Sequence, residues 1–220
     1  MTRVLALSDE VSDSLYGPTL GRLVPDLVVA CGDLPFDYLE YVVTMLNVPL
    51  LYVPGNHDPD VSPDRQRAEP GELLTPFLSR SLEEPPGPQG CTNVDGRVVD
   101  AGGLRIAGLG GSIRYGRGPN QYTQAQMRRR ALRLQLRLLR RRLSGRQGLD
   151  ILITHAPPLG LGDGEDPAHR GFRALHWLVA RATPRILVHG HVHPYGQLQG
   201  DRTIGATKVV NAVAYRCLEV

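Results

Sequence analysis

The sequence has few of the features that would point to several common classes of protein. It contains three cysteines, Cys31, Cys91 and Cys217, and no C-x-x-C pair, so we expect neither a disulfide framework nor a structural zinc site. No apolar run reaches the roughly 18 residues that a membrane-spanning helix needs. Lys208 is the only lysine among 25 basic residues, and a net charge of +3 is too small to indicate nucleic-acid binding by itself.

The N-terminal sequence contains no targeting signal that we can identify. The apolar stretch Val4–Leu7 is too short for the core of a signal peptide, and no small-residue cleavage site follows it. We therefore expect a first strand and a cytoplasmic protein. Because compact domains extend to about 250 residues before they divide, the sequence predicts a single domain over residues 1–220.

Short apolar runs recur along the chain, and most end at glycine, aspartate or histidine. Their length and their content of Val, Ile and Leu are typical of strands buried on both faces by helices. These strands are expected at Val4–Leu7, Leu27–Cys31, Leu50–Val53, Arg105–Leu109, Ile151–Thr154, Ile186–Val188, Lys208–Ala212 and Arg216–Val220. The apolar spacing in Phe36–Leu46 is helical, which predicts a strand–helix–strand unit of the parallel type.

Two segments between these strands have a different character. Residues 59–91 contain seven prolines, which predicts an elaborated loop over one face, with room for a short helix at Leu73–Leu82. Residues 93–99 contain the pair Asp95-Gly96 between polar and apolar residues, which predicts a hairpin with a tight turn.

The longest helix is expected from about Thr123 to Leu143, and Thr123 with Gln126 forms a capping box at its start. Its apolar stripe is predicted at Leu132, Leu136, Leu139 and Leu143, flanked by Met127, Ala131, Leu134 and Leu138. On the other side lie Arg129, Arg133, Arg137 and Arg140. These arginines suit a solvated outer face, and a grip on a phosphate backbone is the alternative.

The polar residues of most interest follow five of the predicted strands. They are Ser8-Asp9, Gly32-Asp33, Gly55-Asn56-His57-Asp58, Thr154-His155 and Gly190-His191-Val192-His193. Ligands of open α/β sheets bind beyond the carboxyl ends of the strands, so these segments should converge at one rim. Carboxylate, amide and imidazole ligands without cysteine suit Mn, Fe or Zn. Two such ions about 3.5–4 Å apart can activate water and hold a phosphate.

This ordered set resembles the calcineurin-like metallophosphoesterase superfamily, and the resemblance covers nearly the whole chain. It implies an α/β fold, a four-layer α/β/β/α sandwich with a two-metal site at the rim of the sheets. It also implies that Asp33 bridges the metals, that Asp9 and His193 bind the first metal, and that the second metal takes Asn56, His155 and His191. His57 would protonate the leaving oxygen, with Asp58 orienting it.

The first motif departs from the family pattern. The usual Asp-x-His is here Asp9-Glu10-Val11, which puts Val11 at the usual ligand position and directs Glu10 away from it. Asp13 is an alternative ligand that could fold back from the following loop. The first metal position is therefore expected to be one ligand short, so the centre holds one or two ions.

Three further residues are candidates for binding substrate. Arg114 follows a strand in a glycine-rich loop and suits a phosphate oxygen, and His169 and Arg170 lie in the acidic loop after His155. For the segment around Asp166, the alternative is a simple helix start.

The sequence thus predicts a metal-dependent hydrolase of phosphate esters, with a phosphodiesterase that uses metal-bound hydroxide as the leading interpretation. Manganese is the expected metal, with Fe, Zn or Ni as alternatives. Nucleotides and nucleic acids are candidate substrates, no membrane partner is expected, and the oligomeric state stays open. A phosphomonoesterase or protein phosphatase of the same fold is one alternative, and a non-catalytic scaffold with a degraded metal site is the other.

Overall fold

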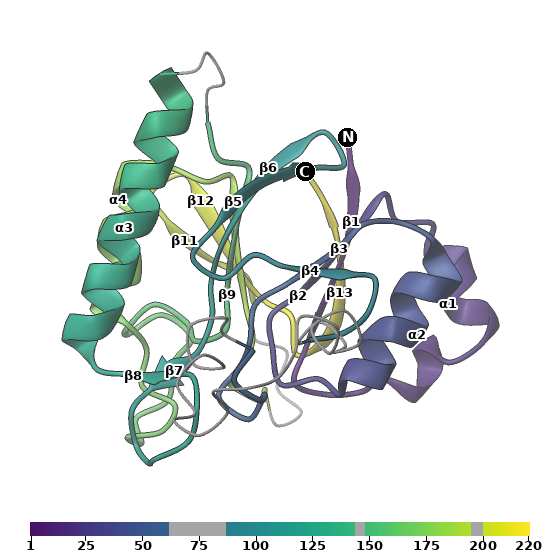
Figure 1. Ribbon diagram of the computed structural model, residues 1–220, viewed down its shortest axis with the longest axis horizontal. Helices are drawn as coiled ribbons and strands as arrows, with labels where there is room; N and C mark the ends of the chain where they lie inside the picture. Colours follow the sequence, from purple (N-terminus) through teal and green to yellow (C-terminus); the bar gives the residue numbers. More distant parts are fainter. Residues whose placement is uncertain (62–86, 144–147, 195–199) are drawn as a thin grey trace, which may run out of the picture.

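Two β-sheets lie face to face between two pairs of helices, which makes a four-layer α/β/β/α sandwich (Figure 1). The structure is a computed structural model and describes residues 1–61, 87–143, 148–194 and 200–220. One outer layer consists of α1 (Pro18–Leu23) and α2 (Phe36–Leu46). The other consists of α3 (Gln124–Leu143) and α4 (Arg173–Ala182).

Each large sheet is built around parallel strands. The first has the order β13-β1-β2-β3-β4, with bounds Ala214–Glu219, Arg3–Ser8, Leu27–Ala30, Leu50–Tyr52 and Cys91–Asn93. The second has the order β11-β12-β10-β9-β6-β5, with bounds Arg202–Ile204, Thr207–Asn211, Ile186–His189, Ile151–Thr154, Leu104–Leu109 and Val98–Ala101. Strand β13 is antiparallel at one edge of the first sheet, and β11 and β5 are antiparallel at the two edges of the second. A small sheet pairs β7 (Ser112–Ile113) with β8 (Gln121–Tyr122), and a 3-10 helix, η1, spans Asp13–Leu15.

Strand β1 shows why these short apolar runs form the centre of the molecule. Val4 and Ala6 belong to the core between the two sheets, whereas Leu5 and Leu7 belong to the core under α1 and α2. All four are buried. Because successive side chains of a strand point to opposite faces, a strand covered on both sides must be apolar at every position. A third core lies between the second sheet and α3 and α4.

The arrangement brings the carboxyl ends of β1, β2, β3, β9 and β10 to one rim. β1, β2 and β3 pair in parallel, and so do β9 and β10. In Figure 1, β1 runs downward from the N-terminus, and the loops that follow the parallel strands gather toward the lower part of the view. The two chain ends meet at the opposite side, where Thr2 and Val220 exchange backbone hydrogen bonds.

Most of the elements predicted from the sequence are confirmed. The helix at Phe36–Leu46 and the strand at Ile151–Thr154 have the predicted bounds, and the other strands agree to within two residues at either end. The capping box also forms: the Thr123 amide donates to Gln126 Oε1 (2.8 Å), and the Gln126 amide donates to Thr123 Oγ1 (3.2 Å). The expected helix at Leu73–Leu82 and most of the proline-rich loop lie outside the described residues.

The predicted hairpin at residues 93–99 is wrong. Cys91–Asn93 pairs with β3 in the first sheet, whereas Val98–Ala101 pairs with β6 in the second. The Asp95-Gly96 pair therefore lies where the chain passes from one sheet to the other. The tight turn comes later, at Gly102 and Gly103, which both have positive φ and connect β5 to β6.

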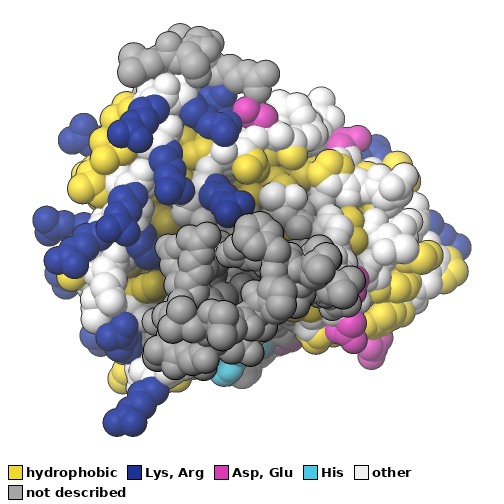
Figure 2. All heavy atoms as spheres, viewed as in Figure 1, with side chains coloured by type: hydrophobic (Ala, Val, Ile, Leu, Met, Phe, Trp, Pro, Cys, Tyr) yellow, Lys and Arg dark blue, Asp and Glu magenta, His cyan; other side chains and the backbone are white. Residues whose placement is uncertain are grey.

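The predicted apolar face of α3 is also wrong. The residues expected to flank the stripe, Met127, Ala131, Leu134 and Leu138, are the ones that pack into the core. Leu132, Leu136 and Leu139 are 49%, 48% and 43% exposed. Both sets repeat at helical spacing, so periodicity alone does not choose between them. In Figure 2, basic side chains gather on the side of the molecule formed by α3, with hydrophobic side chains among them.

Among the described helices, none combines the length and the apolar character that crossing a bilayer requires. All three cysteines are free thiols: Cys31 is buried, Cys91 half-buried and Cys217 exposed.

We predict that two leucine truncations in α3 will separate the buried face from the exposed one. Leu134→Ala should lower the free energy of unfolding by about 2–5 kcal/mol because it leaves a cavity in the core. Leu136→Ala, the matched control on the same helix, should change it by about 0.5 kcal/mol or less. Urea denaturation followed by circular dichroism measures both. Equal losses would mean that Leu136 is also packed.

Candidate metal centre

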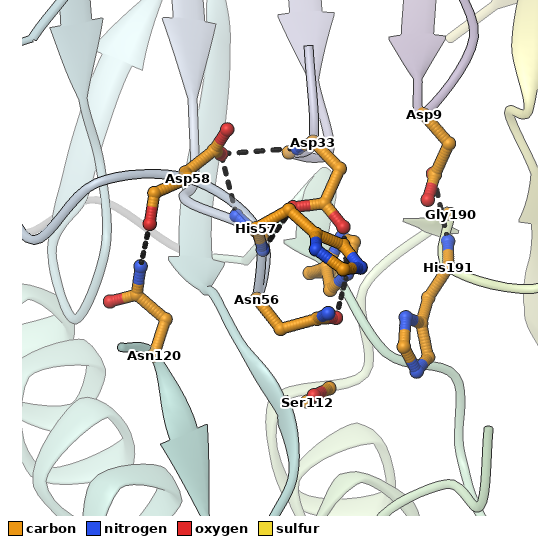
Figure 3. Close-up of polar contacts among 12 residues, drawn as sticks. Asp9, Asp33, Asn56, His57, Asp58, Ser112, Asn120, Gly190 and His191 are labelled. Carbon is orange, nitrogen blue, oxygen red and sulfur yellow. Dashed lines mark hydrogen bonds and ion pairs between the residues drawn. The ribbon is translucent and has the colours of Figure 1, made fainter. Parts of the chain in front are cut away.

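Four of the predicted metal ligands meet at the rim of the two sheets. Asp9 follows β1, Asp33 follows β2 and His191 follows β10 (Figure 3), and His155 follows β9. One ligand atom from each lies within 4.8 Å of all the others. Asn56, which follows β3, joins them through its Oδ1, 2.9 Å from His155 Nε2. Segments far apart in the sequence thus converge, as parallel strand ends predict.

His155 is surrounded by hydrogen-bond acceptors. Its Nδ1 donates to the Cys31 carbonyl at 2.8 Å, which directs Nε2 toward Asn56 Oδ1 and, at 3.3 Å, Asp33 Oδ2. Two oxygens facing one ring nitrogen need a positive charge between them, either a proton or a metal ion. Burial lowers the pKa of His155, but the hydrogen bond and charge of Asp33 outweigh it and raise the pKa to about 9. Without metal, the proton therefore stays on the ring at neutral pH.

His191 differs from His155 in the ring nitrogen that donates and in the direction of its pKa shift. Its Nε2 donates to the Ala168 carbonyl at 2.9 Å, which leaves Nδ1 to act as the ligand atom. Burial, reinforced by the charge on His155, lowers the pKa of His191 to about 3. A neutral ring is the form that binds a metal. Its backbone amide also donates to Asp9 Oδ2 at 2.8 Å, which connects the ends of β10 and β1.

Three of the candidate ligands occupy the left-handed region of the backbone. The φ angles of Asp9, Asp33 and His191 are 60°, 57° and 68°. Non-glycine residues adopt this region at an energetic cost, and such strain gathers at functional sites. Glycine is required beside them: a Cβ on Gly190 would overlap Ser8 Oγ and Asp9 Oδ2, and one on Gly55 would overlap Asp33 Oδ1.

Asp58 is placed differently from our expectation. We expected it to orient the His57 ring, but its Oδ2 accepts the backbone N–H of Gly55 at 2.7 Å and of Asp33 at 3.1 Å. It therefore ties together the loops that follow β2 and β3. Through these bonds Asp58 positions Asp33 and Asn56. The His57 amide adds to the same arrangement by donating to Asp33 Oδ1 at 2.8 Å.

A cavity of about 420 Å³ opens over these ligands. His57 and His193 line it. Tyr115, which we did not single out from the sequence, also lines it and accepts a hydrogen bond from Asn56 Nδ2 (3.0 Å). That bond turns Asn56 Oδ1 toward His155. A tyrosine within a glycine-rich loop after a strand was the signal available in the sequence.

Of the three predicted substrate-binding residues, the structure brings one to this cavity. His169 lines it, and the His169 Nδ1 lies 2.8 Å from Asp166 Oδ2. Arg114 instead donates to the Gln121 carbonyl and to Gln126 Oε1, which ties β7 to the start of α3. Arg170 is exposed and is not among the residues that line the cavity.

The first motif also differs from our expectation. Val11 is 38% exposed and is not among the residues that line the cavity. Glu10, which we expected to point away, lies with Oε1 2.6 Å from His193 Nδ1. The reason is the backbone: Asp9 has positive φ, so the side-chain alternation of β1 does not continue beyond Ser8.

The donor set fits a divalent metal. Two carboxylates, an amide oxygen and imidazoles whose tautomers are set by backbone carbonyls are the ligands that Mn, Fe and Zn accept. The crowding of acceptors around His155 Nε2 supports the same conclusion, because a bound cation would replace the proton there.

We predict a pH dependence that follows from His155. Because its folded pKa lies above 6.5, its stabilising contribution is complete below pH 6.5 and is lost as pH rises through about 9. The urea midpoint of the metal-free protein should therefore fall over that window. Apparent Mn²⁺ affinity should rise by up to about tenfold per pH unit, because binding displaces the proton. Calorimetric titrations at pH 6.5, 7.5 and 8.5 measure this, and a flat profile would mean a neutral ring.

Gly190→Ala should disrupt the centre, since the new methyl group displaces Ser8 Oγ and Asp9 Oδ2. We expect Mn²⁺ affinity to fall at least about tenfold and the free energy of unfolding to fall by about 1–3 kcal/mol. Gly21→Ala is the control, because nothing lies within 4 Å of a Cβ at that position. Wild-type affinity in Gly190→Ala would show that the Asp9 loop tolerates the methyl group.

Known proteins resemble this chain in fold. A solved crystal structure aligns with 99% of this chain and 94% of its own, with a TM-score of 0.63 at 17% identity. The crystal structure of TT1561 from Thermus thermophilus aligns with 97% of this chain and 89% of its own, with a TM-score of 0.58 at 18% identity. Such low identities show a shared fold alone.

Sequence comparison adds a curated relative and a family. UPF0046 protein T07D4.2 of Caenorhabditis elegans is 39% identical over 66 residues, which is 29% of this chain and 16% of that protein. The chain therefore spans a small part of the length of that relative. The family model described as calcineurin-like phosphoesterase matches residues 13–195, a stretch that begins after Asp9 and includes the other candidate ligands. The chain belongs to the calcineurin-like phosphoesterase family.

Proposed function

We propose that the protein is a phosphodiesterase. The observation that carries this proposal is the lining of the metal cavity: among the described residues, it contains no arginine or lysine. A monoester dianion places more negative charge in the site than a diester does, and proteins commonly bind such dianions with arginine or lysine. A diester carries one negative charge, which the metals can balance. The charge available in the cavity thus favours the diester.

Several residues of the cavity have distinct parts in this proposal. Asp33 and Asp9 supply the carboxylates, and Asn56 presents its oxygen because Tyr115 holds the other end of its amide. His57 is exposed at the cavity and is the group proposed to protonate the leaving oxygen. Divalent metals bound here, of which Mn²⁺ suits the ligand set, would supply activation of water and charge neutralisation of the phosphate.

The rim of the cavity suits a nucleotide or a nucleic-acid end. Tyr115 is 45% exposed at the mouth, which gives a base an aromatic ring for stacking. His169, paired with Asp166, lies with its ring centroid 5.1 Å from that of His191 and so flanks the metal ligands. We assign His169 to contact with a non-reacting phosphate oxygen.

With Mn²⁺ present, the protein should hydrolyse bis-p-nitrophenyl phosphate at least about tenfold faster than p-nitrophenyl phosphate, measured as kcat/KM. EDTA should abolish both reactions. Asp33→Asn should do the same, because it removes a carboxylate that faces His155. Faster monoester hydrolysis would instead support a phosphomonoesterase. No hydrolysis of either compound with Mn, Zn, Ni or Fe would support the scaffold alternative.

His57→Gln should test the acid. Its kcat should fall by about 10²–10⁴-fold on 3′,5′-cyclic AMP, whose alkoxide needs a proton, and much less on the p-nitrophenyl diester. Metal content should stay unchanged. His176→Gln is the matched control, because His176 Nε2 donates to the Leu159 carbonyl and is not among the residues that line the cavity. Equal losses on both substrates would argue against an acid role for His57.

A further inference from the structure

Three histidines follow β9 and β10, and each has a ring nitrogen within hydrogen-bond distance of an acceptor. His155 uses Nδ1 and His191 uses Nε2, and each donates to a backbone carbonyl. Both rings are buried. In the neutral ring that binds a metal, a bond of this kind sets the tautomer, because the protonated nitrogen faces the acceptor and the other nitrogen carries the lone pair. His155 and His191 are therefore prepared as ligands by the fold itself.

His193 has a different kind of partner. Its Nδ1 lies 2.6 Å from Glu10 Oε1, so a carboxylate takes the place that backbone carbonyls take for the other two rings. The side chains of His193 and Glu10 are 34% and 51% exposed. A carboxylate is a stronger acceptor than a carbonyl, and it brings a negative charge to the metal site. The Glu10 contact thus fixes the orientation of the His193 ring, which packing in the core does not fix.

The backbone explains why Glu10 is the residue in this position. β1 ends at Ser8, and Asp9 has positive φ, so the chain turns sharply before Glu10. The Glu10 amide donates to the Ser8 carbonyl at 2.6 Å, which closes that turn. The position that carries a histidine in the family pattern, Val11, is exposed instead.

We infer that Glu10 is the positioning carboxylate of the first metal position. By accepting the Nδ1–H of His193, it would leave the Nε2 lone pair of that ring for an ion that Asp9 and Asp33 would also hold. It also adds negative charge where the first motif lacks its histidine. The inference rests on the proposed metallophosphoesterase centre and adds a residue to it. Asp13, the other acidic residue of this loop, is exposed in η1 and is the competing candidate.

The experiment measures metal binding directly. Calorimetric titration of Mn²⁺ into the full-length protein should show two binding events for the wild type. Glu10→Ala should weaken the weaker event by about 10–100-fold and leave the stronger one unchanged. Glu10→Gln should lose less, because its carbonyl oxygen still accepts the Nδ1–H. Asp13→Ala, the matched control, should bind like the wild type.

Electron paramagnetic resonance gives a second readout. Two Mn²⁺ ions about 3.5–4 Å apart are spin-coupled, so Glu10→Ala should convert the coupled spectrum at two equivalents of Mn²⁺ into that of isolated ions. Thermal melts check that the variants fold. Because the Glu10 side chain is half exposed, its replacement should not unfold the protein. Rescue of the coupled spectrum by Glu10→Gln supports positioning, since a loss of charge alone would not be rescued.

The outcomes separate this inference from the proposed function. Wild-type binding by Glu10→Ala overturns the role of Glu10, whether the wild type takes up one ion or two. A loss in Asp13→Ala with none in Glu10→Ala overturns it as well and assigns the gap to Asp13. If the wild type binds two ions and Glu10→Ala loses one, while no phosphodiester is hydrolysed, the proposed function fails and the role of Glu10 stands.

Discussion

The centre depends on one electrostatic constraint: oxygen acceptors face His155 Nε2, so a positive charge must lie among them. The Cys31 carbonyl sets that orientation from the other side of the ring, and Asp33 and Asn56 supply the oxygens. A group this crowded with acceptors is costly in an apolar interior without a compensating cation. Much of the surrounding structure serves to hold these atoms together in spite of that cost.

The bracing comes mainly from the backbone. Asp58 accepts the amides of Gly55 and Asp33, and Asp9 accepts the amide of His191. Carboxylates thus join loops from neighbouring strands and, in the case of Asp9, loops from the two different sheets. Residues with left-handed backbone angles complete the arrangement, together with glycines at positions where a Cβ would overlap neighbouring atoms. The rigid, double-faced sheets behind the rim allow these strained turns to persist.

The sequence predicts the strands and the ligand-bearing loops well because their signals are local. Strands buried on both faces read as continuous apolar runs, and carboxyl ends of parallel strands share an edge. What fails depends on contacts beyond the segment. α3 carries two leucine stripes, and only packing against the second sheet decides which is buried. Likewise, the Asp-Gly turn signal does not show that the chain passes from the first sheet to the second at residues 94–97.

The site was predictable as a set of ligands but not as a set of partners. The partner of Glu10 depends on the backbone angle of Asp9, and the partners of Asp58 are backbone amides, which no side-chain pattern indicates. The positive φ of Asp9 changes the direction of the side chains that follow β1, and the residue type at position 9 does not by itself predict that angle. Tyr115 was missed because its contact with Asn56 joins two loops 59 residues apart. Sequence patterns therefore identify one group of each of these hydrogen bonds but not its partner.

The exposed leucines of α3 have a consequence for the behaviour of the protein at high concentration. α3 and α4 contain ten arginines and no acidic residue, and Trp177 extends the apolar surface toward α4. Two molecules that met through this face would bring arginines against arginines. This repulsion acts over about 10 Å at 0.1 M salt and shortens as salt is added. The arginines thus oppose self-association through this face, and that opposition is weakest in concentrated salt.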